Sequence, residues 1–320
     1  YLRFVQANSF DVTYGGGEAN VSVSLANYGM DAAFVTKVPD NSIGQAAINS
    51  LRQHGVNTDF IAKGGNRLGI YFLEKGASQR PSKVIYDRAD SSISTASQQN
   101  FDWDAIFEGA KWFHFTGITP ALGENAQKLT ENACKAAKEN GLTVSCDLNY
   151  RKNLWSTEKA GQVMGKLMKY VDVCISNEED AEKVFGIKAE NTDVTGGKLN
   201  LEGYKDVSKQ LKSKFNFDKV AITLRESISA SVNNWAAMLY AEDEFYFSKK
   251  YSIDIIDRVG GGDSFGGGLI YALMNKFDMQ KSIEFAVAAS CLKHSIEGDF
   301  NYVTVDEVMA LLKGDGSGRV

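Results

Sequence analysis

The sequence predicts an α/β protein whose mostly parallel β-sheet is covered by helices on both faces. Two observations predict this fold. Strand-like and helix-like segments alternate along most of the chain, and this alternation is typical of right-handed βαβ units. One strand-like segment, WFHFTG at residues 112–117, is apolar enough to be a buried strand, as expected when helices cover both faces of a parallel sheet.

The elements follow from apolar periodicity and from stop signals. A helical pattern over residues 124–140 is closed by Gly141, and a second one over 44–55 ends in Gly55, because glycine readily adopts the left-handed conformation that ends helices. Further helices are predicted over 157–170, 178–186 and 203–214. Further strands are predicted over 32–38, 142–148, 171–176 and 218–223.

Two regions interrupt the alternation, because their strand-like segments follow each other without a helix between them. Residues 229–250 have the pattern of a strand meander, and residues 67–88 have the pattern of two neighbouring strands. Together with FDVTYGG at residues 10–16, the second region can form a small separate sheet. We therefore expect one domain over residues 1–320, with lid strands at about 8–16 and 67–90 inserted in the α/β core.

Composition and charge argue against several classes of function. The net charge is −5 and the pI is near 5.4, so no nucleic-acid partner is expected. No apolar run reaches the ~18 residues of a membrane span, so no membrane partner is expected. The four cysteines lie far apart without a C-x-x-C pair, which argues against a zinc site or a disulfide framework and favours a cytoplasmic location.

Three glycines stand before Asp263, at the start of an apolar helix-like run. Glycines before a helix leave its first N–H groups free to face an anion, and the helix dipole adds positive charge there. An aspartate beside that anion could accept the proton of an attacking hydroxyl, as phosphoryl transfer to an alcohol requires. A glycine turn followed by a helix cap needs the same residues. The motif alone leaves both interpretations open, and it matches neither a P-loop nor the G-x-G-x-x-G dinucleotide pattern.

Three motifs in the same order resemble those of the ribokinase-like (PfkB) sugar kinases. Residues 257–263 resemble the D-T-x-G-A-G-D signature, with Arg258 and Gly261 in place of Thr and Ala. Residues 15–20 resemble the sugar-binding G-G-x-x-x-N motif, and residues 177–180 resemble N-x-x-E with Asp180 as a shorter final acid. The resemblance covers nearly the whole chain and implies a ribokinase-like three-layer α/β/α core with a small β-sheet lid.

Within this family, the chain is most similar to the 2-keto-3-deoxygluconate kinases. Three stretches carry the similarity, at residues 113–122, 147–155 and 292–301. The resemblance implies ATP-dependent phosphorylation of the primary alcohol of this sugar acid, with Asp263 as base and Gly260, Gly261 and Gly262 as anion hole. A kinase for another sugar, such as fructose, and a non-catalytic sugar or nucleotide sensor on the same fold are the alternatives.

The resemblance also implies which residues bind the two substrates. A sugar carboxylate calls for arginine, whose planar fork bonds it bidentately, and Tyr86 and Arg88, two apart on a strand, would share a face. The residues expected to bind the sugar acid are Gly16, Asn20, Tyr71, Tyr86, Arg88, Arg151, Asp263 and Asp299. The residues expected around ATP are Asn149, Asn177, Thr223, Arg225 and the three glycines, with Asp180 near Mg²⁺.

The small sheet is expected to act as a lid over the sugar, because phosphoryl transfer requires that water be kept from competing with the alcohol. Small sheets with exposed edges also tend to pair with a copy of themselves. The sequence therefore predicts a homodimer, or a higher homo-oligomer, joined through the lids.

Overall fold

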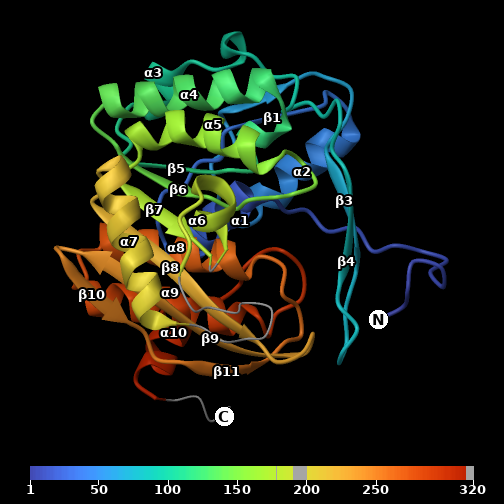
Figure 1. The fold of residues 1–320 in the computed structure, drawn as a ribbon. Helices are drawn as coiled ribbons and strands as arrows, with labels where there is room; N and C mark the ends of the chain where they lie inside the picture. The colour runs from blue at the N-terminus through green and yellow to red at the C-terminus, as the bar shows by residue number, and fades with distance from the viewer. Residues whose placement is uncertain (178, 190–199, 315–320) are drawn as a thin grey trace.

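The computed structural model describes residues 1–177, 179–189 and 200–314 (Figure 1). Its largest sheet has the order β10-β9-β8-β7-β6-β5, with β11 also paired to β9. Strands β5 to β8 run parallel, whereas β9 runs antiparallel to β8, β10 and β11. The strands of this sheet are β5 (Trp112–Thr116), β6 (Thr143–Asp147), β7 (Val173–Ser176), β8 (Lys219–Ser227), β9 (Val232–Ala241), β10 (Glu244–Phe247) and β11 (Tyr251–Asp254).

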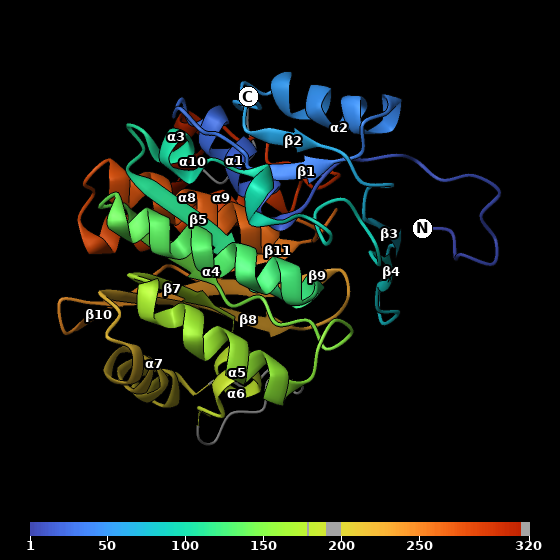
Figure 2. The ribbon, with the colours of Figure 1, turned by 90° about the horizontal axis from the view of Figure 1, so that it is seen from above.

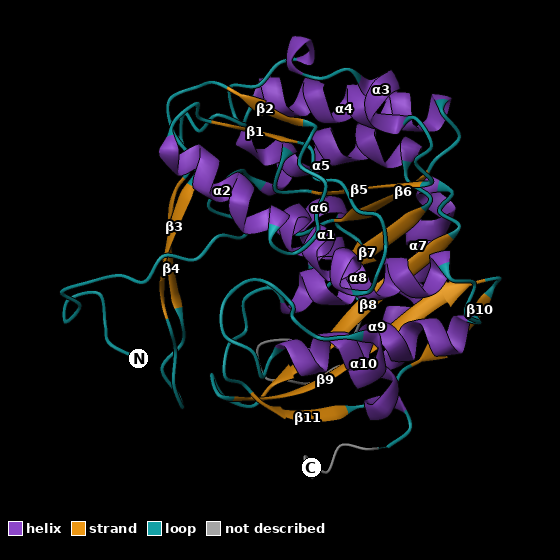
Figure 3. Ribbon diagram, turned by 180° about the vertical axis from the view of Figure 1, so that it is seen from behind, coloured by secondary structure: helices purple, strands orange, loops and turns teal. Residues whose placement is uncertain are grey.

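Two smaller sheets lie outside this one. Strands β1 (Thr36–Val38) and β2 (Ile61–Lys63) form a parallel pair. Strands β3 (Ile70–Glu74) and β4 (Lys83–Asp87) form an antiparallel pair that projects beside the body of the molecule (Figures 1 and 3). We call the β3–β4 pair the lid.

Helices cover both faces of the large sheet (Figure 2). The helices of the described residues are α1 (Gly17–Asn27), α2 (Ser42–Arg52), α3 (Trp103–Phe107), α4 (Glu124–Glu139), α5 (Thr157–Leu167), α6 (Asp180–Phe185), α7 (Leu201–Phe215), α8 (Gly261–Met274), α9 (Met279–Lys293) and α10 (Val305–Leu312), with 3₁₀ turns η1 (Gln98–Asn100), η2 (Pro120–Leu122) and η3 (Met168–Tyr170).

Alternate residues of the central strands divide between two cores. Val220 and Ile222 of β8 belong to the core shared with α4, α5 and α7, whereas Ala221 between them belongs to the core shared with α8 and α9. Successive side chains of a strand point to opposite faces, so a strand covered on both sides must be apolar throughout. The predicted fold class is confirmed: the protein is α/β, with a mostly parallel sheet and helices on both sides.

Several predicted elements differ in extent or in place. The predicted strand 32–38 is shortened to β1. The predicted strand meander of 229–250 is observed as the antiparallel strands β9 and β10, which extend the large sheet. The predicted helix 178–186 is observed as α6, while Glu178 lies outside the described residues.

Residues 8–16 form no strand, contrary to the prediction that they belong to the small sheet. Strands β3 and β4 pair with each other along their full length. The segment contributes a side-chain contact instead, because the rings of Phe10 and Phe72 lie 5.6 Å apart.

Glycines inside α8 let three helices approach closely. A Cβ on Gly267 would lie 2.8 Å from Cβ of Ser24 in α1, and a Cβ on Gly268 would lie 3.0 Å from Cα of Ala286 in α9. This close packing places the first turns of α1 and α8 side by side, and the candidate site lies there. No helix among the described residues is long and apolar enough to cross a membrane.

Candidate active site

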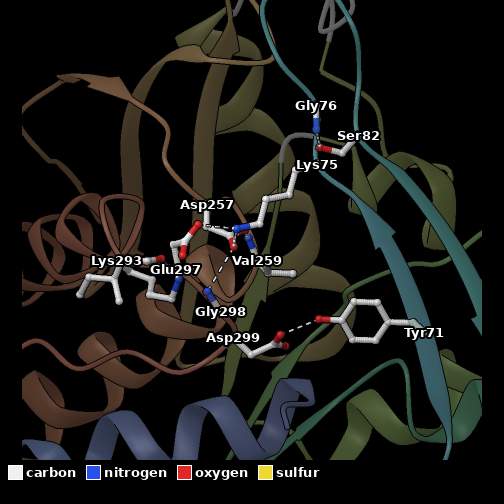
Figure 4. Close-up of polar contacts among 11 residues, drawn as sticks. Tyr71, Lys75, Gly76, Ser82, Asp257, Val259, Lys293, Glu297, Gly298 and Asp299 are labelled. Atoms are coloured by element: carbon white, nitrogen blue, oxygen red, sulfur yellow. Dashed lines mark hydrogen bonds and ion pairs between the residues drawn. The ribbon is translucent and has the colours of Figure 1, made fainter. Parts of the chain in front are cut away.

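A chain of hydrogen bonds joins four of the predicted sugar-binding residues. Asn20, buried in the first turn of α1, donates from Nδ2 to Oδ2 of Asp263 at 2.7 Å and to Oδ1 of Asp299 at 3.3 Å. The hydroxyl of Tyr71, on the lid strand β3, donates to Oδ2 of Asp299 at 2.5 Å (Figure 4). Segments 228 to 279 residues apart in the sequence therefore meet at one point.

The glycines of residues 15–17 are required by this meeting. A Cβ on Gly15 would lie 2.2 Å from Oδ1 of Asp299, and Gly16 has a φ of 138°, which side chains disfavour. A Cβ on Gly17 would lie 3.6 Å from Oδ1 of Asp263. The first glycine motif therefore brings its backbone against both carboxylates.

The second glycine motif turns into α8 through Gly260, which has a φ of 74°. A Cβ on Gly260 would lie 2.1 Å from the carbonyl oxygen of Asp299, and a Cβ on Gly261 would lie 2.6 Å from the ring of His294. A Cβ on Gly262, by contrast, would meet nothing within 4 Å. Packing within the protein thus accounts for the first two glycines but not for the third.

Asp263 stands in the first turn of α8, and its surroundings favour the neutral acid. Burial raises the pKa of Asp263 to about 6, while the hydrogen bond from Asn20 and the charge of Arg151 act in the opposite direction. The negative charge of Asp299 adds to the increase. A carboxylate with a pKa near neutrality is suited to accept a proton during a reaction.

Two arginines from distant segments approach each other beside this carboxylate. Arg88 follows lid strand β4, and its guanidinium carbon lies 4.5 Å from the centre of the Tyr86 ring, so the predicted shared face of these two residues is confirmed. Burial lowers the pKa of Arg88, and the positive charge of Arg151 lowers it further. Arg151 lies in the loop after β6 and also acts on Asp263. Positive charge from both side chains favours binding of an anion in this part of the site.

A second pair of carboxylates lies at the carboxyl ends of β6 and β7. Burial raises the pKa of Asp147 well above its ordinary value, and the charges of Asp180 and Asp263 raise it further. Asn149 donates to both oxygens of Asp147, at 3.2 Å from its backbone N–H and at 3.3 Å from Nδ2. Asp180 is buried and accepts from the backbone N–H of Tyr150 at 3.2 Å.

The other residues expected around ATP lie at the same end of the sheet. The side-chain oxygen of Asn177 accepts from the backbone N–H of Asp180, the first residue of α6, at 2.9 Å. Thr223 is buried on β8, two residues before Arg225. The charge of Arg225 lowers the pKa of Arg258, in the glycine motif, after the larger effect of burial. Arg225 therefore lies near the start of α8.

Two lysines and an aspartate complete the site and were not predicted from the sequence. Lys75, just after β3, forms ion pairs with Asp257 at 3.1 Å and with Glu297 at 2.9 Å (Figure 4). Asp257 also accepts from the backbone N–H of Val259 at 3.2 Å and of Gly298 at 3.1 Å. Lys293, at the end of α9, is fully buried nearby. Isolated lysines are usually solvated charges, so the sequence carried no signal for either one.

Asp147 was also missed, although it stands where ligands of α/β sheets collect, at the carboxyl end of a strand. A cavity of about 1940 Å³ opens on the sugar side of the site, and residues 15–18, Lys75, Arg88 and Asp299 contribute to its wall. The predicted sugar-binding residues are thus brought together around Asp263. Among the described residues, no hydrogen bond joins the Thr223 side chain to them.

Comparisons with known proteins agree with this geometry. The model of the pfkB family of carbohydrate kinases matches residues 3–301. The crystal structure of 2-dehydro-3-deoxygluconokinase from Thermotoga maritima is 56% identical, with a TM-score of 0.94 over 98% of this chain and 93% of that chain. A PfkB family carbohydrate kinase from Listeria grayi is 33% identical, with a TM-score of 0.90 over 98% and 94%. The 2-dehydro-3-deoxygalactonokinase of Haloferax volcanii is 32% identical over 99% of this chain and 92% of its own length.

Proposed function

Because this chain belongs to the pfkB family of carbohydrate kinases, we propose that it transfers the γ-phosphoryl group of ATP to the primary alcohol of 2-keto-3-deoxygluconate. This compound is the 2-dehydro-3-deoxygluconate after which the Thermotoga maritima relative is named. The relative from Haloferax volcanii is named for the galactonate epimer, so the substrate class is a 2-keto-3-deoxy sugar acid.

The position of Arg88 in the cavity wall, with the positive charge of Arg151 acting on it, is the observation that carries the choice of a sugar acid. A neutral sugar needs no pair of guanidinium groups, and holding two of them together without an anion is unfavourable. A carboxylate between them would offset this repulsion and accept hydrogen bonds from both planar forks. Tyr71 and Tyr86, paired across the lid strands, would supply further donors to the sugar.

Asp263 would act as the general base. Its pKa of about 6 leaves it ionised at neutral pH, yet close enough to neutrality to take the proton of the alcohol as the oxygen attacks phosphorus. Oδ1 of Asn20 is buried and has no hydrogen-bond partner among the described residues. It would accept a hydroxyl of the sugar, together with Asp299, while Gly16 lets the sugar approach the backbone.

The backbone N–H groups of Gly260, Gly261 and Gly262 would hold the transferred phosphoryl group at the start of α8. The open space around Gly262 supports this role, because a ligand that approaches the backbone there would exclude a side chain. Positive charge from the helix dipole and N–H groups is preorganised for the charge that develops at the phosphoryl oxygens.

ATP and Mg²⁺ would lie at the carboxyl ends of β6 to β8. Asn149, Asn177, Thr223 and Arg225 would contact the nucleotide. Mg²⁺ favours one or two carboxylates together with phosphate oxygens and water. The neighbouring carboxylates of Asp147 and Asp180 fit this preference, since the charge of Asp180 raises the pKa of Asp147. The metal would neutralise charge on the phosphates.

A coupled assay of ADP release across a panel of acceptors tests the proposal. The panel contains 2-keto-3-deoxygluconate, its galactonate epimer, gluconate, fructose and ribose. We expect kcat/KM for the two 2-keto-3-deoxy acids to exceed that for the neutral sugars at least ~100-fold, because a neutral ligand would leave the guanidinium groups of Arg88 and Arg151 without the carboxylate that they bind. Preference for fructose or ribose would reject the sugar-acid assignment. Binding of ATP and the acid without ADP release would identify a sensor instead of a kinase.

Two further properties accompany this function. A cytoplasmic location suits the four free thiols, of which Cys134, Cys146 and Cys174 are buried. A homodimer joined through the lids is supported by the outer face of the lid, where Ile70 and Ile85 are 45% and 54% exposed. Both lid strands also leave one edge open to pairing.

A further inference from the structure

Lys293 lies in this site, but the proposed chemistry assigns no role to it. It is the last residue of α9, and it is 0% exposed. Lysine is almost never fully buried unless its charge is compensated, because an ammonium loses its hydration in the interior. Its Nζ donates to the carbonyl oxygen of Ile296 at 3.0 Å. The free-energy cost of burying this ammonium group indicates that Lys293 has a function in the protein.

The side chain lies directly beneath the glycine motif. Cε of Lys293 would lie 3.4 Å from a Cβ on Gly260. The turn that Lys293 holds through Ile296 continues into Gly298, whose backbone N–H donates to Asp257 at 3.1 Å. It then reaches Asp299, whose carbonyl oxygen packs against Gly260. Lys293 therefore supports the turn on which the left-handed Gly260 rests.

The positive charge of Lys293 lies close to the negative charges of three aspartates. Asp257, Asp263 and Asp299 surround the glycine motif, and their charges favour the ammonium form of Lys293, whose pKa is lowered chiefly by burial. Lys75 neutralises Asp257 from the lid side at 3.1 Å. Without a cation on the interior side, three carboxylates would face the place where the phosphoryl group of ATP must bind. Repulsion of that anion would be strong in such a buried setting.

We propose that Lys293 is a positioning residue for phosphoryl transfer, holding the Gly260–Gly262 N–H groups in place and supplying, from beneath, the positive charge that lets them bind a phosphoryl group among three aspartates. The inference deepens the proposed kinase function and rests on it. Lys293 touches neither substrate in this arrangement, so its effect is transmitted through the glycine motif and should appear in turnover rather than in substrate affinity.

The test compares Lys293→Met, which keeps the length and removes the charge, with Lys138→Met as the matched control. Lys138 pairs with Asp172 at 2.7 Å on the far end of the sheet. We expect kcat of K293M to fall about 10- to 100-fold, less than the ~10²–10³-fold for loss of an anion-hole donor itself because Lys293 acts through the glycine motif, with KM values for ATP and the sugar acid changed less than ~3-fold. The melting temperature should stay equal or rise, because methionine is buried at lower cost than an ammonium. K138M should keep its kcat.

Chemical rescue separates charge from bulk. Lys293→Ala removes the atoms of a propylammonium ion, so added propylammonium should restore part of the lost kcat, whereas propanol at the same concentration should not. A kcat of K293M within about twofold of the wild type would overturn the proposal. A purely structural lysine would instead show a lower melting temperature, equal losses in all kinetic constants and no rescue.

A measurement without the sugar keeps the two proposals apart. Hydrogen exchange of the peptide covering residues 257–263 is followed with and without MgATP, in the wild type and in K293M. Protection by MgATP in the wild type that is lost in K293M supports the role of Lys293 even if no acid in the panel is phosphorylated, in which case only the proposed substrate fails. Equal protection in both proteins overturns the role of Lys293 whatever the substrate.

Discussion

At the scale of single residues, burial of Asp263 raises its pKa, which favours its proposed role as a base but lowers the stability of the folded protein at neutral pH. Its raised pKa means that ionising it in the folded protein is unfavourable, and the same property makes it a usable base at neutral pH. Stability contributed by this group is fully present below the unfolded-state pKa near 4 and is lost as the pH rises through about 6. The folded protein therefore carries an unfavourable charge at pH 7 for the sake of its reaction.

Replacing Asp263 by asparagine separates these two effects. Asp263→Asn keeps the shape and most hydrogen bonding but cannot accept a proton, so kcat should fall ~10²–10⁴-fold while the Kd values for ATP and the sugar acid change little. The melting temperature at pH 7 should be equal or higher. Steady-state kinetics and calorimetry measure both quantities. Near-normal turnover in the variant would show that Asp263 only stabilises the start of α8.

The pH profile provides an independent test of the same carboxylate. Since the base must be ionised, kcat/KM should be level above about pH 7 and fall tenfold per unit as the pH drops below the Asp263 pKa of about 6. Initial rates between pH 5 and 9 with a non-binding buffer series measure this. A profile that stays level down to pH 5 would contradict the assignment, and the residual activity of Asp263→Asn should lack the transition.

Arg151 should determine specificity for the acid rather than for the nucleotide. Arg151→Lys keeps the charge but loses the planar fork, so KM for the sugar acid should rise about tenfold, in line with the loss of one charge-assisted hydrogen bond, while KM for ATP changes little. Arg52→Lys, at an arginine bonded to Thr58 in another part of the chain, is the control. An equal increase in both KM values would place Arg151 on the nucleotide or in the scaffold.

The residues of the site were predictable where a motif or a strand end marked them. Asp263, Asn20 and the glycines stand in motifs, and Arg151 follows a strand end, so the sequence alone indicates them. Lys75 and Lys293 carry no such mark. Lys75 depends on ion pairs with Asp257 and Glu297, which lie about 180 residues or more away in the chain, and Lys293 depends on burial against the glycine motif; no local pattern encodes those contacts.

At the scale of elements, the parallel strands were predictable because burial on both faces leaves an apolar run that periodicity detects. The lid strands β3 and β4 were predictable from the interrupted alternation of strands and helices. The conformation of residues 8–16 was not predictable. Their composition is typical of a strand, but Phe10 packs its ring against Phe72 and the segment forms no β-sheet hydrogen bonds with the lid. The antiparallel extension by β9 to β11 depends on long-range pairing that composition does not reveal.

The lid should respond to the sugar acid more than the body does. Tyr71 and Arg88 belong to the lid and face the site, so bound acid should protect residues 67–88 from hydrogen exchange while the strands β5 to β8 change little. Exchange with and without the acid, followed by mass spectrometry, measures this, with ribose as the control ligand. Uniform protection along the chain, or none in this segment, would mean that the lid does not close on the substrate.

At the scale of the whole molecule, the proposed dimer would form through the outer face of the lid. Ile70 and Ile85 lie on the face opposite Tyr71 and Tyr86, and both are largely exposed. We expect a dimer in light scattering, and Ile85→Asp should dissociate it because a buried unpaired carboxylate is costly at an interface. Ile43→Asp, at an isoleucine that is 60% exposed on α2, should leave the dimer intact. A monomeric wild type would reject the proposal.

The contacts that tie the lid to the core include the one from Tyr71 to Asp299 and, just after β3, the one from Lys75 to Asp257, and these have a consequence for the timing of the cycle. The phosphorylated sugar acid cannot leave beneath a lid that remains fastened, so both contacts must open once in every turnover. The departing product carries more negative charge than the acid that entered, and the aspartates to which the lid is fastened repel it. Product release, rather than phosphoryl transfer, is then the step that sets the maximal rate, and that rate should slow in viscous solution.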